Sequence, residues 1–142
     1  ARAQIVEEEI KPRLKRGEIV ICDRFFYSTL AYQGYGHRQD LGTLRYLIDY
    51  ATGGLEPDLV VLLDIDPEVG LKRKEEQKEW NRLDGYDLEF HKRVRQGFLA
   101  MAKDDPKRWV VIDAGRPVDE VKEELLKEVE RKLIEAGIIE GV

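Results

Sequence analysis

The hydrophobic pattern of the chain alternates between short apolar runs and helical repeats. Three near-continuous runs rich in β-branched residues occupy residues 19–22, 59–63 and 109–112. Such runs are typical of parallel strands that are buried on both faces. Stretches with the apolar spacing of helices separate the runs. The alternation predicts an α/β fold, in which a three-layer arrangement places helices on both faces of a parallel sheet with right-handed crossovers.

The helical stretches carry recognisable start and stop signals. Val6, Ile10 and Leu14 recur every four residues, and Gly17 is placed to cap the end of that helix. A second helix is expected over about residues 40–52. The next begins at Asp66-Pro67-Glu68, which supplies a cap, a first-turn proline and an acid that favours the helix dipole. Apolar residues line two further helices: Phe90, Val94, Phe98 and Met101 in one, and Val118, Val121, Leu125, Val129 and Leu133 in the other.

Composition limits the classes of function. The 142 residues contain neither repeats nor linkers, so a single domain is expected over residues 1–142. A hydrophobic content of 42% argues against disorder, and a net charge of −5 argues against general nucleic-acid binding. No signal peptide or membrane-spanning segment is evident. The single cysteine, Cys22, excludes an internal disulfide, fits a cytoplasmic protein and is expected to pack in the interior.

The most informative chemistry follows the first apolar run. Asp23 and Arg24 stand at its carboxyl end, where open α/β sheets bind ligands. A guanidinium suits a phosphate because it can donate hydrogen bonds to two of its oxygens at once. The Asp23 carboxylate can accept a hydrogen bond from a water that is bound to Mg²⁺. Ser28, Thr29 and Gln33 follow at helical spacing and can hydrogen-bond a polar ring. One turn would therefore carry both a group that binds phosphate and groups that hydrogen-bond a nucleotide base.

Each of these residues also has a plainer interpretation. Arg24 could form an ordinary ion pair with Asp23 or another acid, and Asp23 could cap a turn or a helix. Ser28 and Thr29 could cap a helix, and Gln33 could lie on the surface. Spacing alone leaves both interpretations open.

The stretch from Asp23 to Gly34, Asp-Arg-Phe-Phe-Tyr-Ser-Thr-Leu-Ala-Tyr-Gln-Gly, resembles the thymidylate kinase (dTMP kinase) family. The resemblance continues through most of the chain. Residues 1–4 resemble the helix that carries the family's thymine-reading arginine, and residues 53–59 resemble the approach to the next strand. Residues 81–84 and 90–94 resemble the mobile lid and the helix after it. The resemblance implies a P-loop nucleotide kinase fold and transfer of the ATP γ-phosphoryl group to dTMP, giving dTDP.

The same resemblance implies roles for individual residues. Arg24 would clamp the 5′-phosphate of dTMP, Arg2 would reach a pyrimidine carbonyl, and Gln33 would contact the ring edge. Ser28 and Thr29 would approach the same nucleotide. The implied partners are dTMP and ATP with Mg²⁺, in a cytoplasmic homodimer formed through helix faces, with neither nucleic acid nor a membrane involved.

A lid is expected over about residues 72–86. Its basic residues are Lys72, Arg73, Lys74, Lys78 and Arg82. Cations that arrive on closure lower the barrier to phosphoryl transfer, and closure excludes water, so we expect Arg73 and Arg82 to be catalytic. The lid departs from the family pattern at Glu75 and Gln77, which occupy positions where some bacterial members of the family have arginines. The plainer interpretation is a solvated helix with alternating charges.

The ATP side of the site is less complete in the sequence. Residues 113–115 follow the last apolar run, where the family places a loop beside adenine. None of the twelve glycines opens the motif Gly-x-x-x-x-Gly-Lys-[Ser/Thr], whose backbone amides cradle phosphates. We therefore expect the chain to be the carboxyl-terminal portion of a kinase, incomplete at its amino terminus and inactive alone. The alternatives are a kinase for another nucleotide or deoxynucleoside, and a non-catalytic nucleotide-binding protein without a phosphate loop.

Overall fold

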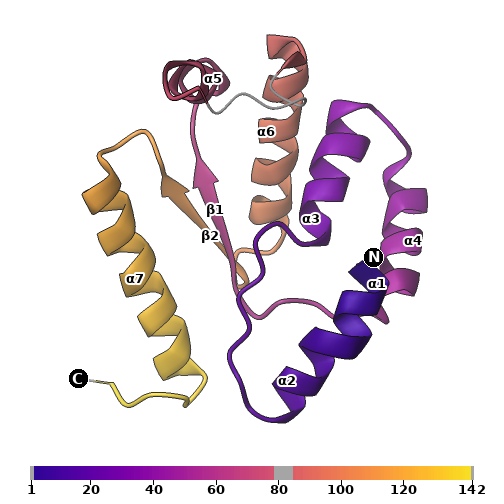
Figure 1. Cartoon of the computed structure of the whole chain (residues 1–142), viewed down its shortest axis with the longest axis vertical. Coiled ribbons are helices and arrows are strands. Elements are labelled where there is room, and N and C mark those ends of the chain that lie inside the picture. Colours follow the sequence, from indigo (N-terminus) through magenta and orange to yellow (C-terminus); the bar gives the residue numbers. More distant parts are fainter. Residues whose placement is uncertain (1, 79–84, 142) are drawn as a thin grey trace. The chain divides into compact units, whose positions relative to one another are not determined.

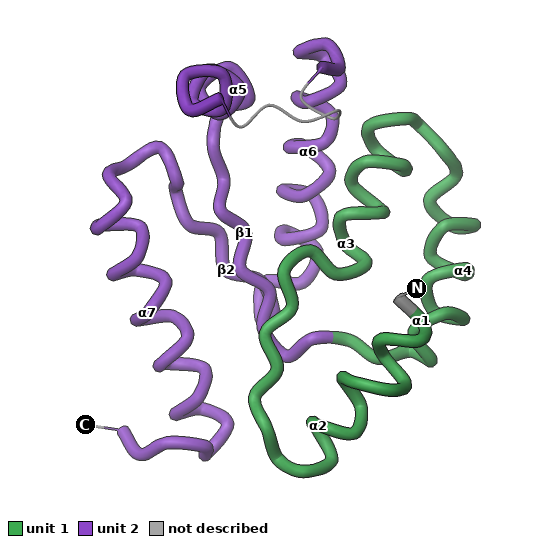
Figure 2. The backbone as a smooth tube through the Cα atoms, viewed as in Figure 1, with its two compact units in different colours: residues 1–56 green, residues 57–142 purple. Residues whose placement is uncertain are grey.

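The computed structural model of the protein describes residues 2–78 and 85–141 (Figure 1). It divides into two compact units, Ala1–Glu56 and Pro57–Val142 (Figure 2), and each unit is described by itself. No helix in these described ranges combines the length and apolarity that crossing a membrane requires. The single domain expected over residues 1–142 stays a prediction.

The second unit is organised around two parallel strands, β1 (Val60–Asp64) and β2 (Trp109–Asp113). The register pairs Val60 with Trp109 and Asp64 with Asp113, so both carboxyl ends lie at the same edge. The amide of Ala114 donates to the carbonyl of Asp64 at 2.7 Å and extends the ladder past the end of β2. These strands confirm the two later apolar runs to within one residue.

Three helices complete the second unit: α5 (Pro67–Glu76), α6 (Leu88–Asp104) and α7 (Val118–Glu135). They confirm the three later helical stretches. Helix α6 contacts both strands and α7 contacts β2, and the two helices flank the strands in Figure 1. The core of this unit is formed by the buried side chains of Phe90, Val94, Ala102, Trp109 and Ile112.

The first unit is helical. Its first helical stretch runs through α1 (Arg2–Ile5), a π-helix η1 (Val6–Ile10) and α2 (Lys11–Lys15). Val6 and Ile10 of the predicted face are buried, whereas Leu14 is exposed. Gly17 follows with a φ of 79°, the left-handed conformation expected of a residue just past a helix end.

A second helical stretch, α3 (Phe26–Thr29), continues into a second π-helix, η2 (Leu30–Gly36). It is followed by α4 (Leu41–Thr52), which α1 contacts. The core of the first unit is made of Val6, Ile10, Phe26, Tyr27, Leu30, Ala31 and Ile48. The sequence pattern did not predict the π-helical segments η1 and η2, because it was read with the spacing of an α-helix, whereas hydrogen bonds in a π-helix join residues five apart.

The predicted strand at residues 19–22 is wrong in this structure. These residues form no strand, and the sheet of the described chain pairs only β1 with β2. Ile19 is 59% exposed and Ile21 is 92% exposed, and Cys22 is exposed rather than packed in the interior. An apolar run becomes a strand only where its backbone groups meet a neighbouring ladder, and none is present for this run among the described residues.

Helix α4 begins at a charged cap. The Oδ2 atom of Asp40 accepts hydrogen bonds from the Thr43 amide at 2.8 Å and the Thr43 hydroxyl at 2.7 Å. These bonds lower the pKa of the Asp40 carboxyl, because both stabilise its charged form. Gly53 ends the helix in the left-handed conformation, with a φ of 63°.

The Asp40 cap predicts a pH dependence of stability. Since the native pKa lies below the unfolded one, the stabilisation is present above about pH 4 and is lost as pH falls through the native pKa. Asp40→Ala should therefore lower the melting temperature at pH 7, and the difference from the unchanged protein should shrink in acid. Thermal unfolding between pH 7 and pH 2.5 measures it. A difference that is constant across this range would contradict the assignment.

Candidate functional site

The Asp23–Arg24 turn leads into α3, and its backbone is unusual. Arg24 has a φ of 57°, a left-handed conformation that costs a non-glycine residue roughly 1–3 kcal/mol. Both side chains are exposed. Conformations of this kind cluster at binding sites, because they re-aim a side chain at the expense of local strain.

The guanidinium of Arg24 faces an aromatic ring. Its Cζ atom lies 5.6 Å from the centroid of the Tyr32 ring, within the range of a cation–π interaction. Within residues 2–78 and 85–141, Arg24 forms no ion pair with a carboxylate. The plainer interpretation, an ion pair with Asp23, is therefore not observed. The guanidinium is thus exposed, and no carboxylate of the described residues neutralises its charge.

The polar residues expected to read a base follow on the same helical stretch. Ser28 and Thr29 are half-buried in α3, and Gln33 is exposed in η2. The residue that precedes α3 is Phe25, and no side chain caps either α3 or η2. Ser28 and Thr29 are therefore not helix caps, whereas the surface position suggested for Gln33 is confirmed.

Two predicted site residues cannot be located by their side chains. Arg2 lies in α1, but its side chain is not described, and Arg82 lies outside the described residues. Their roles stay predictions.

Arg73 binds the loop that follows β2. From α5, its Nη1 atom donates to the carbonyl of Ala114 at 2.9 Å and its Nη2 atom lies 3.4 Å from the carbonyl of Gly115. The amide of Gly115 donates to Asp113 Oδ1 at 2.8 Å, which fixes the same loop. In the described part of the chain no carboxylate pairs with Arg73. Since carbonyls are neutral acceptors, the charge of Arg73 is not cancelled by any group of the described residues.

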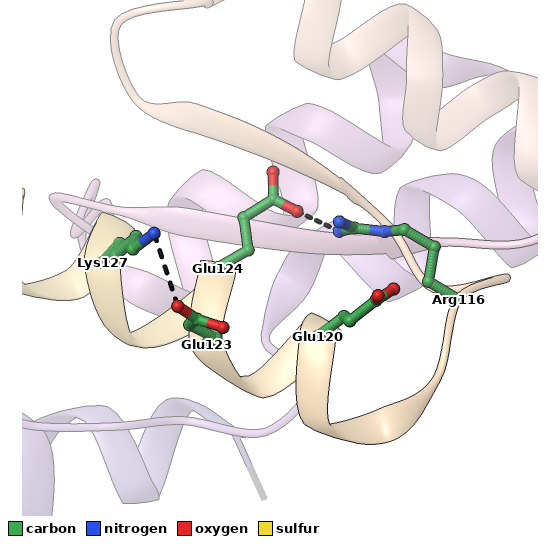
Figure 3. A pocket seen from close by; sticks show the side chains of 5 residues that line it. All are labelled: Arg116, Glu120, Glu123, Glu124 and Lys127. Atoms are coloured by element: carbon green, nitrogen blue, oxygen red, sulfur yellow. Dashed lines mark hydrogen bonds and ion pairs between the residues drawn. The ribbon is translucent and has the colours of Figure 1, made fainter.

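A pocket of about 380 Å³ lies at the start of α7 (Figure 3). The residues that line it are Arg116, Glu120, Glu123, Glu124 and Lys127. Arg116 pairs with Glu124, and the Nζ atom of Lys127 lies 3.6 Å from Glu123 Oε1. The three carboxylates outnumber the two cations, so this pocket does not suit a phosphate.

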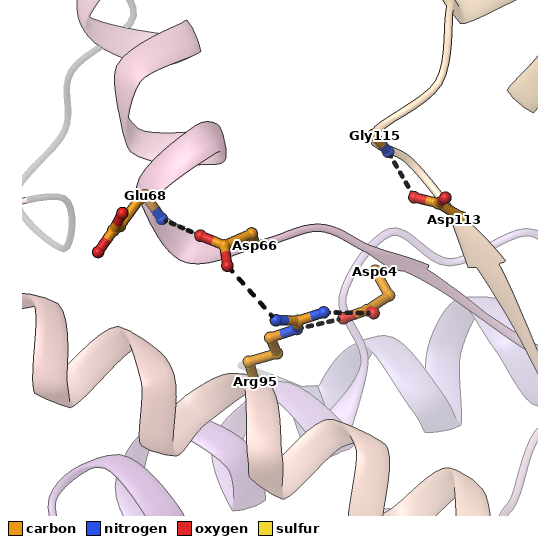
Figure 4. A network of polar contacts seen from close by, with 6 residues as sticks. All are labelled: Asp64, Asp66, Glu68, Arg95, Asp113 and Gly115. Atoms are coloured by element: carbon orange, nitrogen blue, oxygen red, sulfur yellow. Dashed lines mark hydrogen bonds and ion pairs between the residues drawn. The ribbon is translucent and has the colours of Figure 1, made fainter.

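A network of charged side chains lies at the carboxyl end of β1 (Figure 4). Arg95 of α6 donates from Nε to Asp64 Oδ1 at 2.9 Å and from Nη2 to Asp64 Oδ2 at 3.0 Å. Its Nη1 atom also lies 3.9 Å from Asp66 Oδ2. The hydrogen bond to Asp64 raises the pKa of Arg95. This two-point contact ties α6 to the end of β1.

Comparison with known proteins decides the family. A profile of the family described as thymidylate kinase matches residues 1–125. The chain belongs to the thymidylate kinase family.

Relatives named thymidylate kinase support this membership. The protein from Deinococcus radiodurans is 50% identical over 125 residues, which cover 88% of this chain and 61% of the relative. The protein from Roseiflexus castenholzii is 44% identical over 155 residues, which cover 100% of this chain and 68% of the relative. The protein from Carboxydothermus hydrogenoformans is 52% identical over 120 residues, which cover 84% of this chain and 58% of the relative. The chain thus spans about three-fifths to two-thirds of the length of these relatives.

In this thymidylate kinase family chain, four of the predicted residues lie on one continuous stretch of the first unit. Arg24, Ser28, Thr29 and Gln33 follow one another within the first unit, on the turn and on the helical stretch α3–η2. Among the described residues, no group of three histidine, cysteine or acidic side chains is placed to hold a metal. Asp23 is a single exposed carboxylate, which suits only a contact through water.

Sequence reasoning missed the contacts of Tyr32, Asp64 and Arg95. The ion pair joins residues 31 positions apart, which no local spacing reveals. A usable signal was present for Asp64, because an aspartate ends each of the two paired apolar runs. Arg95 gave no such signal, since arginines and lysines are common in that helix.

The Arg95–Asp64 pair predicts a stability difference within the second unit. Arg95→Met should lower the free energy of unfolding by about 1–3 kcal/mol, because it leaves a largely buried carboxylate without its charged donor. Arg131→Met is the matched control, since in the described structure the ion pairs of Arg131 lie on the surface of α7, and this change should alter stability by less than about 0.5 kcal/mol. Urea unfolding measures both. Equal losses in the two variants would show that the pair contributes no more than a surface contact.

Proposed function

We propose that the whole protein transfers the γ-phosphoryl group of ATP to dTMP, giving ADP and dTDP. The observation that carries the proposal is the exposed guanidinium of Arg24, held in a left-handed turn with its charge uncompensated among the described residues. Half-buried hydroxyls follow it at once on α3. The proposal is also supported by family membership and by the names of the relatives.

The acceptor site is assigned to the first unit. Arg24 clamps the 5′-phosphate with two parallel N–H donors and withdraws charge as the second phosphoryl group arrives. Ser28 and Thr29 donate or accept hydrogen bonds toward the nucleotide, and Gln33 contacts the edge of the ring. Arg2 donates to a pyrimidine carbonyl. The support for this set is chemical: one cation for the phosphate and a group of amide, hydroxyl and guanidinium groups for the base.

The transfer itself requires positioning more than covalent chemistry. A phosphate oxygen of dTMP attacks the γ-phosphorus in line, the bond to the β-bridging oxygen breaks, and ADP leaves. Arg73 and Arg82, in a lid over about residues 72–86, stabilise the charge that spreads over the equatorial oxygens. Arg73 suits this role because its present acceptors are neutral carbonyls, so an anionic phosphate would be a stronger partner.

Magnesium accompanies ATP as the cofactor. When bound, it neutralises phosphate charge, and Asp23 would hold one of its waters. An exposed carboxylate beside Arg24 fits this water-mediated contact, since Mg²⁺ keeps several waters and needs few protein ligands.

Further properties complete the proposal. We assign the whole protein a P-loop kinase fold with three layers, in the cytoplasm, with no nucleic-acid or membrane partner. A homodimer is supported by an apolar face on α4, where Tyr46 is 71% exposed, Leu47 is 56% exposed and Tyr50 is 84% exposed. Light scattering of the whole protein distinguishes dimer from monomer.

Two other functions remain to be discriminated. A kinase for another nucleotide or deoxynucleoside would share the Asp23–Arg24 turn, and a non-catalytic nucleotide-binding protein would show no turnover. The 142-residue chain alone is expected to be inactive, because it contains no phosphate-loop motif. ADP release from the whole protein in the presence and absence of dTMP separates the three cases.

Arg24→Ala in the whole protein should reduce dTMP-dependent turnover severely while ATP binding is nearly unchanged. Loss of a charge-assisted phosphate contact from a desolvated site costs about 2–5 kcal/mol. Arg38→Ala is the matched control, since Arg38 is also an exposed arginine of the first unit in a left-handed conformation, with a φ of 59°. Steady-state kinetics with dTMP measure both. Near-normal kcat/KM in Arg24→Ala would place the acceptor phosphate elsewhere.

Base selectivity tests the pocket. The whole protein should prefer dTMP over dCMP by at least about two orders of magnitude, because cytosine presents an amino donor to donors placed for the O4 carbonyl. dUMP should fall between them, since it loses only a methyl contact worth on the order of 1 kcal/mol. Competition kinetics give the order. Equal use of dCMP and dTMP would favour a broader nucleotide kinase, and an unchanged preference in Arg2→Ala would remove Arg2 from the pocket.

A further inference from the structure

Among the described side chains of the first unit, Arg24 and Arg45 each face an aromatic ring, and they differ in their other partners. The Cζ atom of Arg45 lies 5.3 Å from the ring centroid of Phe26, and Arg45 also pairs with Glu56 and Asp49. Carboxylates therefore neutralise the charge of Arg45. Arg24 lies 5.6 Å from the ring centroid of Tyr32 and has no carboxylate partner in the described ranges.

An aromatic face holds a cation in a way that differs from an ion pair. The attraction comes from the negative face of the ring, so it does not occupy the N–H donors of the guanidinium. A carboxylate would occupy those donors and would also repel an incoming phosphate. The ring is thus suited to hold an arginine that must later bind an anion.

The geometry points to Tyr32 as a positioning residue for Arg24: its ring holds the guanidinium in place and leaves the donors for a phosphate monoester. The inference rests on the proposed function, in which Arg24 binds the acceptor phosphate. The left-handed backbone of Arg24 sets the direction of its Cα–Cβ bond, and the half-buried Tyr32 ring restrains its guanidinium group. A long exposed side chain restrained in this way loses less conformational freedom when the ligand binds.

The role predicts an effect that depends on the phosphate. Tyr32→Leu removes the aromatic face and should weaken dTMP binding by about three- to tenfold. Thymidine, which has the same base and sugar but no phosphate, should bind within about 1.5-fold of its affinity for the unchanged protein. Tyr32→Phe retains the face and should bind dTMP nearly as well as the unchanged protein. Tyr35→Leu, a half-buried tyrosine of the same helix η2, is the matched control and should not discriminate between the two ligands.

The experiment is calorimetric titration of the whole protein with dTMP and with thymidine. A double-mutant cycle completes it: in an Arg24→Met background, Tyr32→Leu should change dTMP affinity by less than about 1.5-fold, because the group that Tyr32 positions is gone. Circular dichroism and thermal unfolding of Tyr32→Leu control for folding, so that a weakening of both ligands is interpreted only for a folded protein.

Each outcome separates this inference from the proposed function. Failure of the unchanged protein to bind dTMP overturns both. Normal dTMP binding by the unchanged protein, with equal weakening of dTMP and thymidine in Tyr32→Leu, overturns the positioning role and assigns Tyr32 a direct contact with base or sugar. Unchanged dTMP affinity in Tyr32→Leu, or full additivity in the cycle, overturns the inference and leaves the function in place.

Discussion

The parallel pairing of β1 with β2 is the constraint on which the second unit depends. Parallel neighbours cannot be joined by a tight turn, so the chain must travel from Asp64 back to the start of β2 through α5 and α6. The same pairing brings both carboxyl ends to one edge. That edge receives the Arg95–Asp64 pair and the loop that Arg73 binds. The polar chemistry of this unit is therefore a consequence of the ladder's direction, because the side chains themselves come from distant parts of the sequence.

Five described arginines differ in what their guanidinium groups contact. Arg45, Arg95 and Arg116 pair with carboxylates, so their charge is cancelled and they join elements within a unit. Arg24 contacts a ring and Arg73 contacts carbonyls, so neither charge is cancelled within the described residues. An uncancelled cation retains its attraction for an anionic ligand. Of these five arginines, Arg24 and Arg73 are therefore the better suited to bind phosphates.

Local rules predicted most of the regular structure. The Asp66-Pro67-Glu68 signal places the start of α5, and the side chain of Asp66 accepts a hydrogen bond from the Glu68 amide at 2.9 Å. The runs at residues 59–63 and 109–112 become strands because each finds the other as a ladder partner. Residues 19–22 are similarly apolar but have no such partner in the described structure; they form no strand, and Ile19, Ile21 and Cys22 are exposed. A strand is a property of two segments, whereas a capped helix is largely a property of one.

The sequence by itself determined the family, through the motif that begins at Asp23, and it determined the helices outside residues 26–36 and the residue types expected in a phosphate and base site. Only the tertiary structure decided the partners of those residues. It placed the Arg24 guanidinium against Tyr32 rather than Asp23, joined Arg73 to a loop more than forty positions away, and wound η2 as a π-helix. The physical reason is that caps and hydrophobic periodicity act over one or two helical turns, whereas the partner of a charged group depends on which distant segments the folded backbone brings within a few ångströms.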